Sequence, residues 1–373
     1  MPFLTRIKHF LKSIDIYTAC FVLIFLLSAI IRFRPVIDGT FPYLYDHGRD
    51  MLDVRKIVVD HNFTLIGPTT GLPGIFHGPV HYYLLAIGFL LSGGHPASGV
   101  TMVVLAQLLG GLLCYYLGSR FFSKSFGFIL SLIYLLAYGS ITVSAMFWNP
   151  YWIPVLLVIF YFAVLGALQK NSRYWLLAGL VAGLIAQFEI AFGAFLIPYM
   201  FIVGILFAKK FYKNIYFWGS FLFFFVAFIP LIAFDFRHGM LMTNTLSNIL
   251  LGKNELLGDF IPMDLRFGYR INELTKATVF AVTQHPVVGY FMLGLSCLGV
   301  GYAAYKRNFE SLKYYTIFGL LPVLVFAGMM VYTRHAWHYY WISLQVSYYF
   351  LLAYALYRLV PYIALQNILY VLD

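Results

Sequence analysis

Apolar runs long enough to cross a membrane recur from one end of this 373-residue chain to the other. A helix needs about 20 apolar residues to cross a bilayer, and only helices or closed barrels satisfy their backbone hydrogen bonds there. Hydrophobic residues make up 62% of the chain, whereas only 10% of residues are charged. The sequence therefore predicts an all-α polytopic membrane protein.

Dividing the apolar runs at about 20 residues per span predicts ten transmembrane helices. Their approximate ranges are 16–36, 97–118, 125–146, 150–169, 174–190, 192–208, 214–234, 277–304, 313–332 and 338–359. The first run resembles a signal peptide, but no small-residue cleavage site accompanies it. We expect this run to be retained as the first helix.

Charged residues alternate between the two sides that these helices define. The basic clusters fall on one side, which the positive-inside rule predicts to be cytoplasmic, with both termini there. These clusters are Arg6/Lys8/Lys12, Arg120/Lys124, Lys170/Arg173, Lys209/Lys210/Lys213, Lys306/Arg307/Lys313 and Arg358. Most of the acidic residues and histidines fall on the other side, so we expect the chemistry of a multi-pass cell-membrane protein to face outward.

The net charge of +11 does not indicate a nucleic-acid partner. The basic residues are scattered in short clusters between the spans and form no continuous basic stripe. Membrane topology accounts for them, and the lipid bilayer is the expected partner.

Residues 77–94 are apolar but too short to cross a bilayer between their polar ends. Counted as a full span, this segment would reverse every later helix and place Arg120 and Lys124 outside. We therefore predict a half-helix on the outer side. Two long outer loops then remain, at about 38–96 and 235–276, and long loops are common places for active sites.

The first outer loop begins with YLYDHGRDMLDVRK, residues 43–56, which holds six charged side chains. On a helix, Asp46, Asp50 and Asp53 would share one stripe, with Arg49 at its edge. An amphipathic helix lying on the membrane surface would have this pattern, with its stripe merely facing water. Alternatively, the stripe supplies a base or a cation-holding carboxylate where a lipid-borne substrate arrives.

This loop resembles the first outer loop of the GT-C membrane glycosyltransferases. The resemblance rests on Asp46, Arg49 and Arg55 and on the segment FHGPVHYY, residues 76–83. It points to the protein O-mannosyltransferase superfamily, which includes the lipid A aminoarabinose transferases. The similarity is best over residues 40–90, and the hydropathy pattern extends it to about residue 210.

The resemblance implies a catalytic carboxylate at Asp46, and we take Asp50, on the same stripe, as the second catalytic candidate. His77 stands where the family has a phosphate-binding lysine, and Gly78 replaces a proline, while Pro79 and Tyr82 keep the family's residues. Arg49, His77 and His81 are the candidate substrate-binding residues of this loop. Asp46 is followed by His47 rather than Glu, and FWNPYW has Asn149 where relatives have an acid. A divalent metal is therefore possible but not certain.

Other polar residues fall at outer helix ends. The candidates for substrate binding are Asn149, Glu189, Asp235, Arg237, His238 and His338, with Arg334 and His335 beside the last. Arginine and histidine at such ends can stabilise a departing lipid phosphate, although they are also common interfacial anchors. Asn149 followed by Pro150 also suits a helix N-cap, and Glu189 also suits a solvated turn.

Two functions from different classes fit these patterns. The first is an inverting glycosyltransferase that moves a sugar from a polyprenyl-phosphate donor to a lipid, glycan or protein acceptor on the outer face. The second is a transporter or lipid flippase. The chain lacks the GxGxxG and GxxxxGK[ST] nucleotide-binding motifs, so a transferase on the outer face would need a sugar carried on a membrane lipid. The acids avoid mid-span positions, which favours the enzyme over the transporter.

We expect residues 1–373 to form a single integral-membrane glycosyltransferase domain. Within it, residues 16–210 match the family best, residues 235–276 form the second long outer loop, and residues 277–373 form the C-terminal helices. No soluble C-terminal domain is expected.

Overall fold

The computed structural model describes residues 15–251, 259–335 and 339–372, and these are mostly helical. The described residues contain no β-strand, only isolated bridges between Thr69 and Phe76 and between Phe260 and Arg334. The longer elements are α2 (Ile16–Ile37), α3 (Tyr45–Val58), α4 (Val80–Ser92), α5 (Ala97–Phe121), α6 (Lys124–Leu136), α8 (Ile153–Gln169), α9 (Tyr174–Phe188), α11 (Leu196–Phe207), α12 (Ile215–Val226), α13 (Ile229–Arg237), α14 (Leu241–Leu250), α15 (Met263–Val282), α16 (Pro286–Tyr305), α17 (Phe309–Val331) and α19 (Leu344–Leu372). The all-α prediction is confirmed.

Six helical segments among the described residues are long and apolar enough to cross a membrane. A seventh is formed by α12 and α13 together, which meet at a bend of 50°. Several other helices, such as α6 and α9, are apolar but shorter. The chain is thus a multi-pass membrane protein, as predicted, but the count of ten spans is not confirmed.

Several of the predicted helices are interrupted. The segment 277–304 is not one helix, because α15 ends at Val282 and α16 begins at Pro286, where a proline suits the first turn of a helix. The segment 125–146 is divided at Ala137 between α6 and the short α7 (Tyr138–Val143). The predicted loop 235–276 is also largely helical, since it contains α14 and most of α15.

Arg32 explains how the break between α6 and α7 is tolerated. The break at Ala137 disturbs the hydrogen-bond ladder of the helix, and an unpaired carbonyl would be costly in a membrane. Arg32, buried on α2, donates to the carbonyl oxygens of Leu135 at 3.0 Å and of Ser140 at 2.5 Å, and to the hydroxyls of Ser28 and Ser144. This arginine therefore joins α2 to the interrupted helix.

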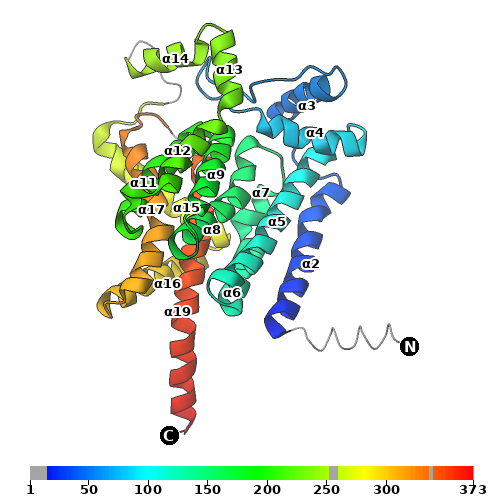
Figure 1. Ribbon diagram of the computed structural model, residues 1–373. Coiled ribbons are helices and arrows are strands. Elements are labelled where there is room, and N and C mark those ends of the chain that lie inside the picture. The colour runs from blue at the N-terminus through cyan, green and yellow to red at the C-terminus, as the bar shows by residue number, and fades with distance from the viewer. Residues whose placement is uncertain (1–14, 252–258, 336–338, 373) are drawn as a thin grey trace.

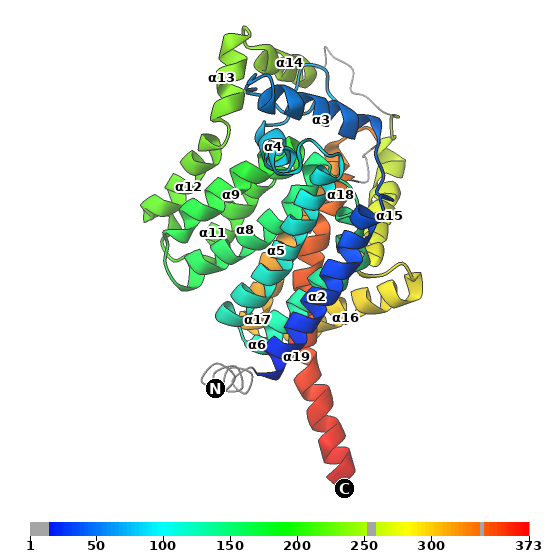
Figure 2. The ribbon, with the colours of Figure 1, turned by 90° about the vertical axis from the view of Figure 1, so that its right-hand side faces the viewer.

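The helices of the first outer loop, α3 and α4, lie at one end of the helix bundle together with α13 and α14. Figure 1 shows α3, α4, α13 and α14 at this end, whereas α2 starts and α19 finishes at the opposite end. In Figure 1, α4 runs across the bundle, and in Figure 2 it is seen almost end-on. This placement agrees with the prediction that residues 77–94 are not a full span. We call this end of the bundle the loop end and the opposite end the terminal end.

This arrangement predicts that Asp60 and His95, both exposed, face the same side of the membrane. In a chain without Cys20 and Cys297, Asp60→Cys and His95→Cys should both react with an impermeant maleimide added to intact cells. Lys209→Cys should react only after permeabilisation, because positive residues mark the cytoplasmic side. Labelling of Lys209→Cys in intact cells, or of His95→Cys only after permeabilisation, would contradict this topology.

Candidate active site

The predicted acidic stripe forms on α3, but it faces α4 rather than only water. The helix begins where the backbone N–H of Leu44 donates to Nδ1 of His47 at 2.9 Å. Asp50 is completely buried, while the side chains of Asp46 and Asp53 are 37% and 33% exposed. The stripe therefore takes part in packing the loop end.

Asp50 is the centre of a buried polar network. Its Oδ1 accepts two hydrogen bonds from Arg49, at 2.8 Å and 3.0 Å, and one from the hydroxyl of Tyr82 at 3.4 Å. Its Oδ2 lies 3.2 Å from Nε2 of His81. Burial alone would raise the pKa of Asp50, but the hydrogen bond from His81 and the charge of Arg49 lower it below its ordinary value. Asp50 is therefore ionised and fully occupied by protein partners.

The same network fixes His81. The indole N–H of Trp152 donates to Nδ1 of His81 at 2.9 Å, so Nε2 is the nitrogen that donates to Asp50. Both ring nitrogens are occupied and the ring is buried. We predicted that Asp50 is catalytic and that His81 binds substrate, but in the structure both residues position α3 and α4 and neither lines the two polar cavities described below.

The loop before α4 forms a narrow hairpin against the end of α9. The N–H of His77 donates to the carbonyl of Pro68, and the N–H of Gly67 donates to the carbonyl of His77. Gly78 donates in turn to the carbonyl of Gln187. A Cβ on Gly67 would overlap the carbonyl of Gly78, and one on Gly78 would overlap the side chain of Gln187. Glycine at both positions therefore permits this close packing.

A small cavity of about 110 Å³ opens between this hairpin and α3. It brings together five of the residues predicted from the sequence, namely Asp46, Arg49, His77, Asn149 and Glu189. Asp46 pairs with Arg49 at 3.0 Å, and Asn149 donates to the carbonyl of Phe188 at 2.6 Å. Asn149 begins the 3₁₀ helix η1 (Asn149–Trp152) and forms no N-cap hydrogen bond. We call this space the acidic cavity.

Burial makes two residues of the acidic cavity neutral. His77 is almost completely buried, which lowers its pKa to about 4, and its Nδ1 has no hydrogen-bond partner among the described residues. Burial also raises the pKa of Glu189 to about 8. At neutral pH, His77 is therefore not the cation that the family's lysine would supply, and Glu189 is a protonated acid that can donate a hydrogen bond.

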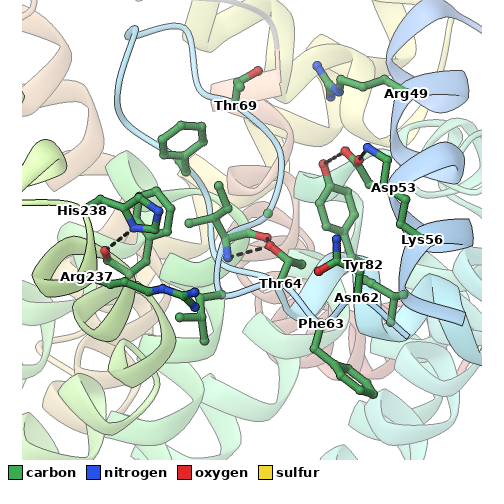
Figure 3. Close-up of a pocket in the computed structure, with 16 residues that line it drawn as sticks. Arg49, Asp53, Lys56, Asn62, Phe63, Thr64, Thr69, Tyr82, Arg237 and His238 are labelled. Atoms are coloured by element: carbon green, nitrogen blue, oxygen red, sulfur yellow. Dashed lines mark hydrogen bonds and ion pairs between the residues drawn. The ribbon is translucent and has the colours of Figure 1, made fainter. Parts of the chain in front are cut away.

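A larger cavity of about 460 Å³ lies on the other side of Arg49. Figure 3 shows Arg49 and Lys56 approaching it from α3, and Arg237 and His238 approaching it from the end of α13. His238 is oriented by the carbonyl of Phe234 at 2.8 Å and stacks on the ring of Phe234. We call this space the basic cavity. Arg49 and Thr69 line both the acidic and the basic cavity.

A third, mostly apolar cavity of about 360 Å³ adjoins the acidic one, and Thr70, Gly71 and Glu189 line both. Asp235 also lines it, but its carboxylate already accepts from the backbone N–H groups of Met242 and Thr243. Asp235 thereby caps α14. Its carboxylate thus has a structural role, and the prediction that Asp235 binds substrate stays a prediction.

The remaining predicted residues lie elsewhere. His338 falls outside the described residues, and His335 lines a separate cavity with Glu273 and Lys276. Sequence reasoning did not single out Thr69, Thr70 and Lys56, because ordinary loop and surface residues look the same in a sequence. In the described part of the chain, no three His, Cys, Asp or Glu side chains are close enough to form a metal site.

Residues 76–234 match the family model for dolichyl-phosphate-mannose-protein mannosyltransferase. The resemblance expected from the sequence is confirmed. The match covers less than half of the chain and begins at Phe76, so it includes FHGPVHYY but not α3. A search of curated proteins finds no match.

Solved structures show the same fold. Crystal structures of ArnT from Cupriavidus metallidurans match 92% of this chain with TM-scores of 0.60 and 0.62, at 12% and 13% identity, in the undecaprenyl-phosphate-bound and apo states. The oligosaccharyltransferase AglB from Archaeoglobus fulgidus, in complex with an inhibitory peptide and a dolichol phosphate, matches 93% of it with a TM-score of 0.54 at 13% identity. This chain spans 59% and 51% of those two proteins, respectively. The predicted GT-C fold is thus confirmed.

The hairpin packing predicts a sharp difference between two glycines of one loop. Gly67→Ala should destabilise the loop end by about 1–3 kcal/mol, because its methyl group meets backbone atoms that cannot rotate away. Gly71→Ala is the matched control, since nothing lies within 4 Å of its new Cβ. Thermal unfolding and limited proteolysis of the purified variants measure the effect. Equal behaviour of the two variants would contradict this packing of the hairpin.

The environment of Glu189 predicts a pH-dependent stability. Because its folded-state pKa is about 8 and its ordinary value is 4.5, the folded protein holds a proton that the unfolded chain loses in this range. The free energy of unfolding should therefore fall as pH rises from about 4.5 to 8. Glu189→Gln stays neutral and should be more stable than the wild type above pH 7, by up to a few kcal/mol. If the free energy of unfolding changed with pH in the same way in the wild type and in Glu189→Gln, the raised pKa of Glu189 would be wrong.

Proposed function

We propose that this protein is a membrane glycosyltransferase that moves a sugar from a polyprenyl-phosphate donor to a hydroxyl acceptor at the loop end. The observation that carries the proposal is the Asp46–Arg49 pair, which stands between an acidic and a basic cavity on the GT-C fold. A carboxylate and a cluster of cations are the two groups that this reaction needs.

The basic cavity suits the phosphate of the donor. Arg49, Lys56 and Arg237 are cationic, His238 lies beside them, and Asp53 is the single acid that lines the cavity among the described residues. Lys56 already neutralises Asp53 at 2.8 Å. A guanidinium such as that of Arg49 or Arg237 can bind phosphate oxygens through two parallel hydrogen bonds. The volume of about 460 Å³ is in the range of small-molecule sites.

The acidic cavity suits the acceptor hydroxyl. Asp46 would accept the hydroxyl proton as the acceptor oxygen attacks the anomeric carbon, and the bond from that carbon to the phosphate oxygen would break. The electron pair leaves with the polyprenyl phosphate, whose charge Arg49 and Arg237 would stabilise. Attack from the side opposite to the phosphate inverts the anomeric configuration.

Other residues assist in this proposal. Glu189, as a protonated acid, would donate a hydrogen bond to a sugar hydroxyl, and the amide of Asn149 borders the same space. The adjoining apolar cavity would receive a hydrocarbon part of a lipid-linked substrate. We propose a lipid, glycan or protein as the acceptor, and the lipid bilayer as the surrounding partner. We propose the cell membrane as the location, with both termini cytoplasmic.

Asp46→Asn tests the proposal directly. It keeps the size of the side chain but removes the proton acceptor, so turnover should fall by roughly two to four orders of magnitude while donor binding survives. The assay supplies purified protein and membranes with a panel of radiolabelled polyprenyl-phosphate sugars and follows label into new products.

Asp60→Asn is the matched control, because Asp60 also lies near α3 but pairs with Arg55 and lines neither cavity. This variant should keep nearly normal turnover. Normal turnover by Asp46→Asn would remove Asp46 from the mechanism, and the absence of transfer from every donor would favour the transporter.

A further inference from the structure

A separate cavity of about 490 Å³ lies near the terminal end, between α16, α17 and α19. Its polar lining includes Lys306, Asn308, Ser311, Tyr315 and Arg358. Two of these side chains are cationic, and no acidic residue lines the cavity in the described part of the chain. The cavity is far along the sequence from the residues of the proposed reaction and shares none of them.

One buried group in this cavity lacks a partner. Tyr315 is only 4% exposed, and its hydroxyl has no hydrogen-bond partner among the described residues. The hydroxyl lies against Gly299, where a Cβ would overlap it, and Gly299 lines the same cavity. An unpaired buried hydroxyl costs about 1–3 kcal/mol. An acceptor oxygen from a bound molecule would remove that cost.

The surroundings indicate that this molecule comes from the membrane. The helix α16 is long and apolar enough to cross a membrane, yet most of it is not buried inside the protein. Leu298 and Tyr305 on this helix are exposed, and Gly299, Ala303 and Leu359 form an apolar part of the cavity wall. A ligand with an anionic head and a hydrocarbon tail fits this combination.

We propose that this cavity binds the phosphate headgroup of an anionic membrane lipid. Lys306 and Arg358 would hold the phosphate, and Tyr315 would donate a hydrogen bond to one of its oxygens. Basic pockets between transmembrane helices commonly bind anionic lipids in this way. The site is independent of the transfer reaction.

Native mass spectrometry of the detergent-purified protein tests this proposal. Phosphatidylglycerol should remain bound, whereas phosphatidylcholine should be lost at lower activation energy. Lys306→Gln combined with Arg358→Gln should weaken phosphatidylglycerol binding by about fivefold for each charge removed. The double variant Arg120→Gln/Lys209→Gln is the matched control, because it removes two exposed charges that line no part of the cavity, and it should bind as the wild type does.

Tyr315→Phe separates binding from folding, because it keeps the buried ring and removes only the hydroxyl. It should bind less phosphatidylglycerol and lose less stability than a truncation would. Equal retention of lipid by wild type, Lys306→Gln/Arg358→Gln and Tyr315→Phe would overturn the proposal. Stabilisation by sn-glycerol 3-phosphate as strong as that by phosphatidylglycerol would also overturn it, because the ligand would then be a soluble phosphate.

Discussion

The loop end depends on the burial of one charge. A carboxylate as deeply buried as Asp50 is stable only if charged and hydrogen-bonding partners surround it. Those partners come from α3 and α4, and His81 in turn accepts from Trp152 of η1. The three segments α3, α4 and η1 are thereby held together around Asp50. Arg49 belongs both to this network and to the ion pair with Asp46. The buried charge of Asp50 therefore also orients Asp46, the residue that we assign to catalysis.

The sequence predicted α3 and its stripe because a spacing of four and three residues defines a helix face by geometry alone. It did not predict which way the stripe faces. In a soluble protein such a stripe usually meets water, but the partners of Asp50 lie about 30 residues away and their contact is not visible in local spacing. The same reason explains why the stripe made Asp50 a second catalytic candidate beside Asp46, although Asp50 is buried and Asp46 lines a cavity.

The loops show a similar division between local and distant causes. The half-helix was predictable because 13 residues of α4 are too few to cross a bilayer. The break before Pro286 has a local signal in the polar segment TQHP, residues 283–286, which the division into spans of about 20 residues did not use. The break at Ala137, by contrast, lies within an apolar run. At Ala137, the break is tolerated because Arg32 on α2 donates hydrogen bonds to the carbonyl oxygens of Leu135 and Ser140. The protonation state of His77 also depends on contacts between segments that are distant in the sequence, because burial keeps this histidine neutral.

The alternative of a transporter is weakened by how the buried charges are used. A transport pathway places ionisable groups where a passing substrate can reach them, usually near the middle of the membrane. Arg32 is the buried cation of α2, and its guanidinium is occupied by serines and carbonyl oxygens that hold the interrupted helix together. By contrast, Asp46 and Arg237 line open cavities at the loop end. An accessible carboxylate and accessible cations therefore lie together at the loop end, where a lipid-linked substrate and an acceptor would meet in the proposed reaction.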